Sequence, residues 1–259
     1  RGNDLTAADK GTYATWLFER ETIRQIRESG DRPFFAYLPF NAPHGASNYE
    51  PPRGAQAPKE YADRFGPAKD DKQLRLAHYR GAVVCMDEAI GRVLDLLDEL
   101  KVADNTIVVF FSDNGGSGGA SNAPLRGHKG QMFEGGIRVP CLVRWPGVTR
   151  PGSVSDEFLT AMEIFPTVAR AAGAELPAGV VLDGFDMRAV LAGQAPSPRK
   201  EMFWQRRGDR AARVGQWKWV DSKAGKGLFD LSQDIGEQHD LSAEKPEVLA
   251  RLQARFDNW

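Results

Sequence analysis

Three short segments of this 259-residue sequence carry side chains that could take part in chemistry. Asp113 and Asn114 place a carboxylate beside an amide oxygen, and both are hard ligands suited to Ca²⁺ or Mg²⁺. Lys129 lies in a loop with glycines on both sides, so its compact ammonium could approach an anion closely. His44 follows a proline and could donate a proton to a leaving group. Each also has an ordinary interpretation, as an Asp-Asn-Gly turn or as an exposed loop side chain.

The elements around these residues predict where they lie. A short aromatic run at 34–38 predicts a buried strand that ends shortly before His44. A continuous apolar run at 106–111 predicts a central parallel strand that ends just before Asp113, and 138–145 is a further strand candidate. In open sheets of this kind, ligands bind beyond the carboxyl ends of the strands. Two segments far apart in the chain therefore indicate one site.

Helical patterns fill the stretches between these strands. Apolar residues recur at helical spacing in 12–28 and 74–101, and a capping box at 160–163 opens a helix that leads to Gly173. Strands that alternate with helices predict an α/β fold, with a largely parallel mixed sheet flanked by helices.

The composition changes near residue 195, where prolines and serines form a linker-like stretch. Beyond it, short strand-like pieces at 214–220 and 227–231 and a helical pattern at 246–256 predict a small C-terminal antiparallel α+β unit. The predicted domains are therefore residues 1–195, the larger α/β part, and residues 196–259.

Composition excludes several classes of protein. Lys and Arg number 34 against 35 Asp and Glu, for a formal net charge of -1, so no overall field favours nucleic acid or an anionic membrane. Two cysteines are too few for a disulfide scaffold. No apolar run approaches the roughly 20 residues that a membrane-spanning helix needs. A charged substrate would have to be held by local groups.

The motifs, taken in order, resemble the sulfatase family of the alkaline-phosphatase-like superfamily. The resemblance covers most of the chain, and its tail, RVGQWKWV followed by GLFDLSQDIGEQHDL, is typical of the small C-terminal unit of that family. The other matching segments are PFFAYLPFNAPH at 33–44, YRGAVVCMDEAIGRVLDLLDEL at 79–100, TIVVFFSDNGG at 106–116, LRGHKGQMFEGGIRVPCLVRWPG at 125–147, FPTVARAAG at 165–173 and LDG at 182–184.

The resemblance implies a role for each candidate residue. Asp113 and Asn114 match the later pair of divalent-metal ligands, normally for Ca²⁺, with Mg²⁺ as the alternative. Lys129 matches the lysine that contacts the sulfate on its leaving-group side. His44 matches the histidine that contacts the sulfate and helps to protonate the leaving oxygen. His44 and Lys129 are thus the expected catalytic and substrate-binding residues. Fixed cations are a physically sensible means of stabilising the charge that develops during sulfuryl transfer.

The family's nucleophile is not found in the sequence. It is a formylglycine made from a Cys or Ser in a Cys/Ser-x-Pro/Ala-x-Arg motif, and neither Cys85 nor Cys141 fits that motif. An early Asp-Asp metal pair and a Lys-x-His pair are also missing. Because all of these belong to the N-terminal portion of the family, we expect a truncated chain whose formylglycine lies in a preceding part. Alone, the chain is expected to be inactive and to bind calcium weakly.

The function that the resemblance implies is hydrolysis of sulfate monoesters, on a small-molecule or glycan substrate, by an arylsulfatase-like sulfuric ester hydrolase. Two alternatives stay open. One is a non-catalytic remnant or binding protein with the same fold, and the other is a phosphoester or phosphonate hydrolase of the superfamily. Nucleic acid is not an expected partner, but an exposed sheet edge could associate with another chain. The resemblance suggests a periplasmic or secreted protein, while the residues themselves leave the compartment unknown.

Overall fold

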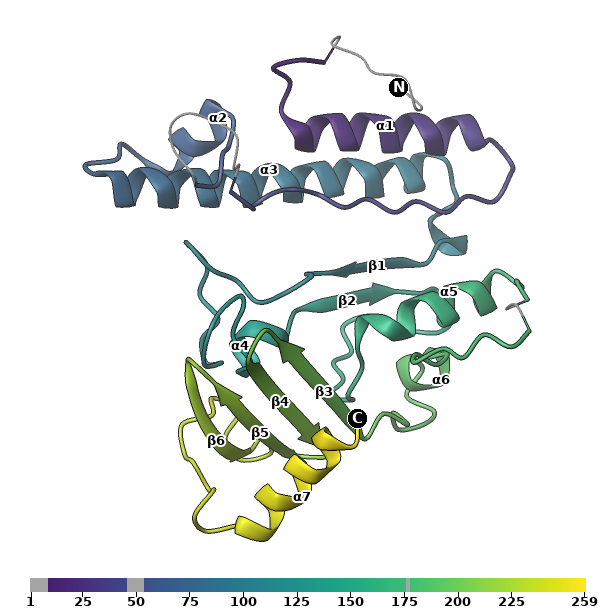
Figure 1. Cartoon of the computed structure of the whole chain (residues 1–259). Helices are drawn as coiled ribbons and strands as arrows, with labels where there is room; N and C mark the ends of the chain where they lie inside the picture. The colour runs from purple at the N-terminus through teal and green to yellow at the C-terminus, as the bar shows by residue number, and fades with distance from the viewer. Residues whose placement is uncertain (1–8, 46–53, 176–177) are drawn as a thin grey trace. The chain divides into compact units, whose positions relative to one another are not determined.

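The computed structural model describes residues 9–45, 54–175 and 178–259 (Figure 1). The chain divides into two compact units, Arg1–Thr106 and Ile107–Trp259, and each is described by itself. The predicted boundary after residue 195 falls inside the second unit and stays a prediction.

The first unit is built on two long helices, α1 and α3. Both were predicted and both are confirmed, with α1 ending at Gly30, whose φ of 55° suits glycine. Arg92 of α3 joins them, because its Nε lies 2.5 Å from Oε1 of the largely buried Glu19 on α1. The helices of this unit are α1 (Ala14–Ser29), α2 (Lys59–Ala62) and α3 (Asp71–Glu99), with 3₁₀ turns at Asp63–Phe65 and Ala103–Asn105.

The expectation of a buried strand at 34–38 is wrong. The segment is extended but belongs to no strand, and the side chains of Phe35 and Tyr37 are 79% and 76% exposed. A strand exists only as part of a hydrogen-bonded ladder. Among the described residues of the first unit, no strand is present to pair with this segment.

The second unit begins with a two-stranded sheet made of β1 (Val108–Phe111) and β2 (Cys141–Arg144). The predicted strands are confirmed, but they pair antiparallel, with Val109 opposite Val143 and Phe110 opposite Leu142. No strand pairs parallel with β1 in the described residues. The largely parallel arrangement expected for this sheet is therefore not seen there. The α/β class itself is confirmed.

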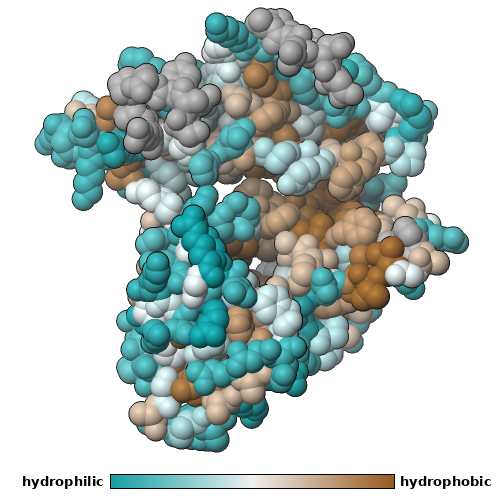
Figure 2. All heavy atoms as spheres, viewed as in Figure 1, coloured by the Kyte–Doolittle hydropathy of each residue, from teal (hydrophilic) through white to brown (hydrophobic). Residues whose placement is uncertain are grey.

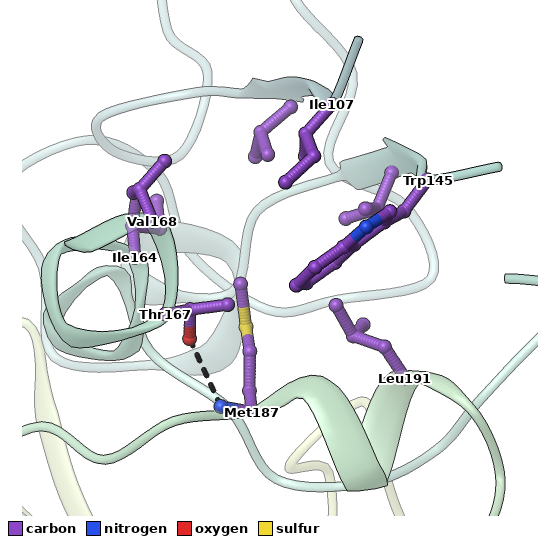
Figure 3. Close-up of a pocket in the computed structure, with 9 residues that line it drawn as sticks. Ile107, Trp145, Ile164, Thr167, Val168, Met187 and Leu191 are labelled. Atoms are coloured by element: carbon purple, nitrogen blue, oxygen red, sulfur yellow. Dashed lines mark hydrogen bonds between the residues drawn. The ribbon is translucent and has the colours of Figure 1, made fainter. Parts of the chain in front are cut away.

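Helix α5 (Ile164–Ala171) covers one face of this small sheet. The predicted capping box is present, since Thr160 N donates to Glu163 Oε2 at 2.5 Å. Val109 and Val143 face an apolar pocket between the strands, α5 and α6 (Arg188–Leu191), where Thr167 Oγ1 accepts a hydrogen bond from Met187 N at 2.9 Å (Figure 3). On the opposite face, Phe110 and Leu142 remain 37% and 62% exposed.

A four-stranded antiparallel sheet and one helix form the C-terminal part, which confirms the predicted antiparallel unit. The strands follow chain order as β3 (Glu201–Arg206), β4 (Asp209–Val214), β5 (Trp217–Ser222) and β6 (Gly225–Asp230), and α7 (Pro246–Asp257) packs on β4 and β5. Strand residues alternate between the two faces. The face under α7 is an apolar core made of Phe203, Ala212, Trp219, Leu228, Val248, Leu252 and Phe256.

The other face of the sheet packs on the segment Met132–Phe133, which precedes helix α4 (Glu134–Ile137). Lys218 of β5 lies on this face with no exposed surface, and its Nζ is 2.8 Å from Oε1 of both Glu134 and Glu237. Glu134 N also donates to Glu237 Oε2 at 2.6 Å. Burial raises the pKa of the Glu237 carboxyl above its ordinary value, although the Lys218 ammonium acts to lower it.

Replacing Lys218 by methionine should lower the free energy of unfolding by about 3–5 kcal/mol, because two buried carboxylates lose their shared cation. Urea unfolding would measure the change. The matched control is Lys226→Met, which removes a lysine that is 74% exposed and paired with Asp221, and should cost less than about 1 kcal/mol. An equal decrease in the free energy of unfolding in the two variants would contradict the role of Lys218 as the shared cation of Glu134 and Glu237.

Candidate active site

The loop after β1 folds back so that Lys129 lies beside the end of the strand. Lys129 N donates to Gly116 O at 3.2 Å, and Gly115 N donates to Gly136 O at 3.0 Å. These two hydrogen bonds join the segment that carries Asp113 and Asn114 to the segment that carries Lys129. The backbone of the second unit therefore brings these three predicted site residues into one neighbourhood.

Asn122 holds the two segments together with its side-chain amide. Its Oδ1 accepts from Gly116 N at 3.0 Å, while its Nδ2 donates to Gly116 O at 2.9 Å and to Gly127 O at 3.1 Å. One side-chain amide thus makes hydrogen bonds with three backbone groups, two on Gly116 and one on Gly127. The sequence analysis missed this residue, because an asparagine in a Gly- and Ser-rich loop is typical of an ordinary turn.

Close backbone packing explains two of the glycines. A Cβ at Gly115 would lie 1.8 Å from Gly135 O, and a Cβ at Gly136 would lie 2.1 Å from Gln131 O. Both distances are shorter than any real contact, so only glycine fits at these positions. The loop after β1 can therefore lie directly against α4.

The oxygen atoms of the candidate metal ligands are available. The Asp113 side chain is exposed, and within the part of the chain that the structure describes neither its carboxylate nor the Asn114 amide has a hydrogen bond or ion pair. Ser112 Oγ donates to Asn114 O at 2.9 Å and so helps to fix the backbone. Two free, hard oxygen donors side by side fit a divalent cation such as Ca²⁺.

The ammonium of Lys129 is also available. The residue is exposed and forms no ion pair among the described residues, although its backbone is held at both N and O. His128 Nδ1 lies 3.1 Å from Lys129 O, and a carbonyl only accepts, so Nδ1 carries the proton. The other ring nitrogen, Nε2, is then left for a ligand. The Lys129 ammonium on this short loop could hold an anionic group.

His44 lies in the first compact unit, whereas Asp113, Asn114 and Lys129 lie in the second. The His44 side chain is exposed, and its backbone N donates to Asn41 O at 2.8 Å. Its Nδ1 lies 2.8 Å from Gly45 O, so Nδ1 carries the proton here as well. Nε2 makes no hydrogen bond among the described residues, and the role predicted for this side chain stays a prediction.

The apolar pocket next to α5 is separate from these residues. Its lining is apolar apart from Thr167, whose hydroxyl already donates to Glu163 O and accepts from Met187 N (Figure 3). It holds no charged group that could bind an anion, so the candidate site is the open loop around Lys129 and Asp113 instead.

Comparison with known families gives two matches that together cover almost the whole chain. A model described as Sulfatase matches residues 9–174, and a model described as N-sulphoglucosamine sulphohydrolase, C-terminal, matches residues 128–258.

Two curated proteins and one solved structure illustrate the similarity. A sulfatase of Formosa agariphila is 34% identical over 249 residues, which are 85% of this chain and 44% of that protein. Arylsulfatase A of Homo sapiens is 32% identical over 280 residues, or 93% of this chain and 52% of that protein. The crystal structure of Ps i-CgsB in complex with k-i-k-neocarrahexaose matches with a TM-score of 0.83 at 31% identity, covering 95% of this chain and 55% of that one. The chain spans about half the length of the curated relatives named here.

Replacing Asn122 by alanine should lower the free energy of unfolding by about 1–3 kcal/mol, because three backbone groups lose their partner. Asn122→Asp keeps the shape and the acceptor but loses both donated bonds, so it should also destabilise the protein. Chemical denaturation would measure both. The control is Asn258→Ala, an exposed asparagine of the same unit without a side-chain hydrogen bond among the described residues, and it should be near neutral.

Proposed function

Because this chain belongs to the sulfatase family, we propose that the complete protein hydrolyses sulfate monoesters at the site formed around Lys129. The observation that carries the proposal is the backbone connection between Gly116 and Lys129. It places the backbone of Lys129, whose ammonium forms no ion pair among the described residues, against the loop that carries Asp113 and Asn114. Such an arrangement suits an anion that is bound by a lysine on one side and by a metal ion on the other.

The two predicted catalytic residues take different parts in this proposal. The Lys129 ammonium binds the sulfate and stabilises the negative charge that develops on the leaving oxygen. Nε2 of His44, which is free because Nδ1 faces Gly45 O, contacts the sulfate. In the imidazolium form, in which both ring nitrogens carry a proton, Nε2 delivers its proton to the leaving group.

Asp113 and Asn114 are the proposed metal ligands, with Ca²⁺ as the ion and Mg²⁺ as the alternative. When bound, the ion supplies positive charge to the sulfate oxygens. Calcium takes about six to eight oxygen ligands, and the described residues contain no cluster of three or more His, Cys, Asp or Glu side chains that could complete the set. The proposed site therefore needs further ligands from elsewhere in the complete protein.

The nucleophile is also proposed to come from elsewhere in the complete protein, as a formylglycine. No Cys or Ser of this chain lies in the motif from which that group is made. A covalent nucleophile carries the step that divides the reaction in two, so residues 1–259 alone should have little or no turnover.

The substrate class that we favour is a glycan sulfate ester. The support is the hexaose bound in the solved structure to which this chain is similar. A small aryl sulfate should serve as a test substrate, since it offers the same ester to Lys129.

An exposed sheet is the proposed contact with another chain. Phe110 and Leu142 leave one face of the β1–β2 sheet apolar and exposed, and each of these strands has an unpaired edge among the described residues. None of the described helices is both long and apolar enough to cross a membrane. Export from the cytoplasm remains part of the proposal, on the basis of the family alone.

The test of function is hydrolysis of a chromogenic aryl sulfate by the protein expressed from its complete reading frame, with calcium present. Lys129→Ala should lower kcat/KM by about 100-fold or more, because a fixed charge on the reacting group is lost. Lys72→Ala, an exposed lysine of α3, is the matched control and should retain activity.

The matching aryl phosphate, measured alongside, decides between the candidate functions. Preference for the phosphate ester would favour a phosphoester hydrolase of the same superfamily. Absence of turnover of both esters, in a reading frame that lacks the Cys/Ser-x-Pro/Ala-x-Arg motif, would favour a non-catalytic protein.

Metal binding is tested by thermal denaturation of the complete protein with calcium and with a chelator. Calcium should raise the Tm, and Asp113→Ala should remove most of this increase, because the ion stabilises only the folded state that it binds. Asp104→Ala, an exposed aspartate without an ion pair among the described residues, should leave the increase intact. Residues 1–259 alone should show no sub-micromolar calcium affinity, and finding such affinity would overturn the proposed sharing of ligands.

A further inference from the structure

Positive charge gathers at one end of the C-terminal sheet, next to the Lys129 loop. The β3–β4 turn carries Arg206 and Arg207, both exposed and both without an ion pair among the described residues. The β5–β6 turn adds the exposed Lys223, whose backbone N donates to Asp209 Oδ1 at 2.9 Å and so ties the two turns together. Figure 2 shows strongly hydrophilic side chains over this end of the sheet.

The carboxylates at this end of the sheet do not neutralise the arginines. Asp221 is paired with Lys226 and Arg210, at 2.7 Å each. Hydrogen bonds from Lys226 and then from Arg210 lower the pKa of its carboxyl below the ordinary value. The carboxylate of Asp209, which accepts from Lys223 N, offsets only one of the three remaining cations, Arg206, Arg207 and Lys223. A surplus of positive charge therefore remains, in a chain whose net charge is -1.

Arg206 connects this charge to the candidate active site. Its Nη1 donates to Gly130 O at 3.3 Å, so its guanidinium lies against the residue that follows Lys129. Gly130 has a φ of 86°, and a Cβ there would come within 3.5 Å of the same nitrogen. That distance is an ordinary contact, so it is the backbone conformation at this position that favours glycine.

We propose that Arg206, with Arg207 beside it, forms a second anion subsite that binds a further sulfate group of a multiply sulfated glycan while Lys129 holds the sulfate ester that is cleaved. A guanidinium offers five N–H donors in a planar fork that matches the oxygens of a sulfate, and only one of the nitrogens of Arg206 is engaged by Gly130. The inference rests on the proposed function, and it narrows the proposed substrate class from any sulfate ester to a glycan that carries several sulfate groups.

A saccharide fits this surface better than a nucleic acid. Proteins that bind single-stranded nucleic acid stack its bases on aromatic side chains. The segments 126–130, 206–209 and 222–226, which make up this surface, contain no Phe, Tyr or Trp, and His128 is their only ring side chain. Their side chains offer charge and hydrogen bonds alone, which suits the sulfate and hydroxyl groups of a glycan.

The test is binding of a polysulfated hexasaccharide to the complete protein, measured by calorimetry, so that it does not depend on turnover. Arg206→Gln should raise the Kd by about 10-fold or more, because a charge-assisted hydrogen bond is lost. Arg206→Lys keeps the positive charge but loses the planar set of N–H donors. Its Kd should therefore lie between those of the unchanged protein and Arg206→Gln. Arg251→Gln makes the same change of charge on α7, which lies away from these turns in Figure 1, and should alter the Kd less than twofold.

Two measurements separate a failure of this inference from a failure of the proposed function. If Arg206→Gln binds the hexasaccharide more weakly but the protein has no sulfatase turnover, the proposed subsite is supported and the proposed function is contradicted. An unchanged Kd in an active sulfatase would overturn the subsite alone.

A loss of aryl sulfate kcat/KM as large as the loss of hexasaccharide affinity would also overturn the subsite, because Arg206 would then act only by supporting the Lys129 loop. Tighter binding of single-stranded DNA than of the hexasaccharide at the same salt concentration would contradict the choice of ligand.

Discussion

The buried contact of Lys218 with Glu134 and Glu237 is the constraint on which the candidate site depends. A charge without exposed surface is tolerated only when opposite charges and hydrogen bonds surround it, so the partners of Lys218 are held in place. Glu134 is followed directly by Gly135 and Gly136, whose backbone groups bond to Arg126 O and Gly115 N. Lys218 thus fixes Glu134, and the hydrogen bond between Gly136 and Gly115 in turn fixes the segment that carries Asp113 and Asn114.

The C-terminal sheet therefore has two different faces. The face under α7 is an apolar core, of the kind that stabilises a small unit by removing side chains from water. The face toward Phe133 combines apolar contacts with buried charge, and it supports the loop that holds Lys129. The end of the same sheet presents Arg206 beside that loop. In this molecule the C-terminal unit supports the candidate site and borders it.

Much of the fold followed from local patterns. Helices α1, α3 and α7 and strand β1 lie within a few residues of their predicted ranges, because apolar spacing and capping residues act over short distances. The aromatic run at 34–38 shows the limit of such reasoning. An apolar run favours an extended backbone wherever it occurs. A strand also needs a second strand to which it can hydrogen-bond, and the sequence of the run does not specify that second strand. For the same reason the sequence did not reveal that β1 pairs antiparallel with β2.

The sequence by itself determined the family and the identity of the four candidate site residues, because the order of short motifs is a property of the chain alone. Tertiary structure decided which side chains hold that site. Lys218 lies 84 residues from Glu134, and Arg206 lies 76 residues from Gly130. No spacing rule joins residues so far apart, since helix and strand periodicities relate only near neighbours. Burial and hydrogen bonding between distant segments made these contacts, and they arise only when the chain folds.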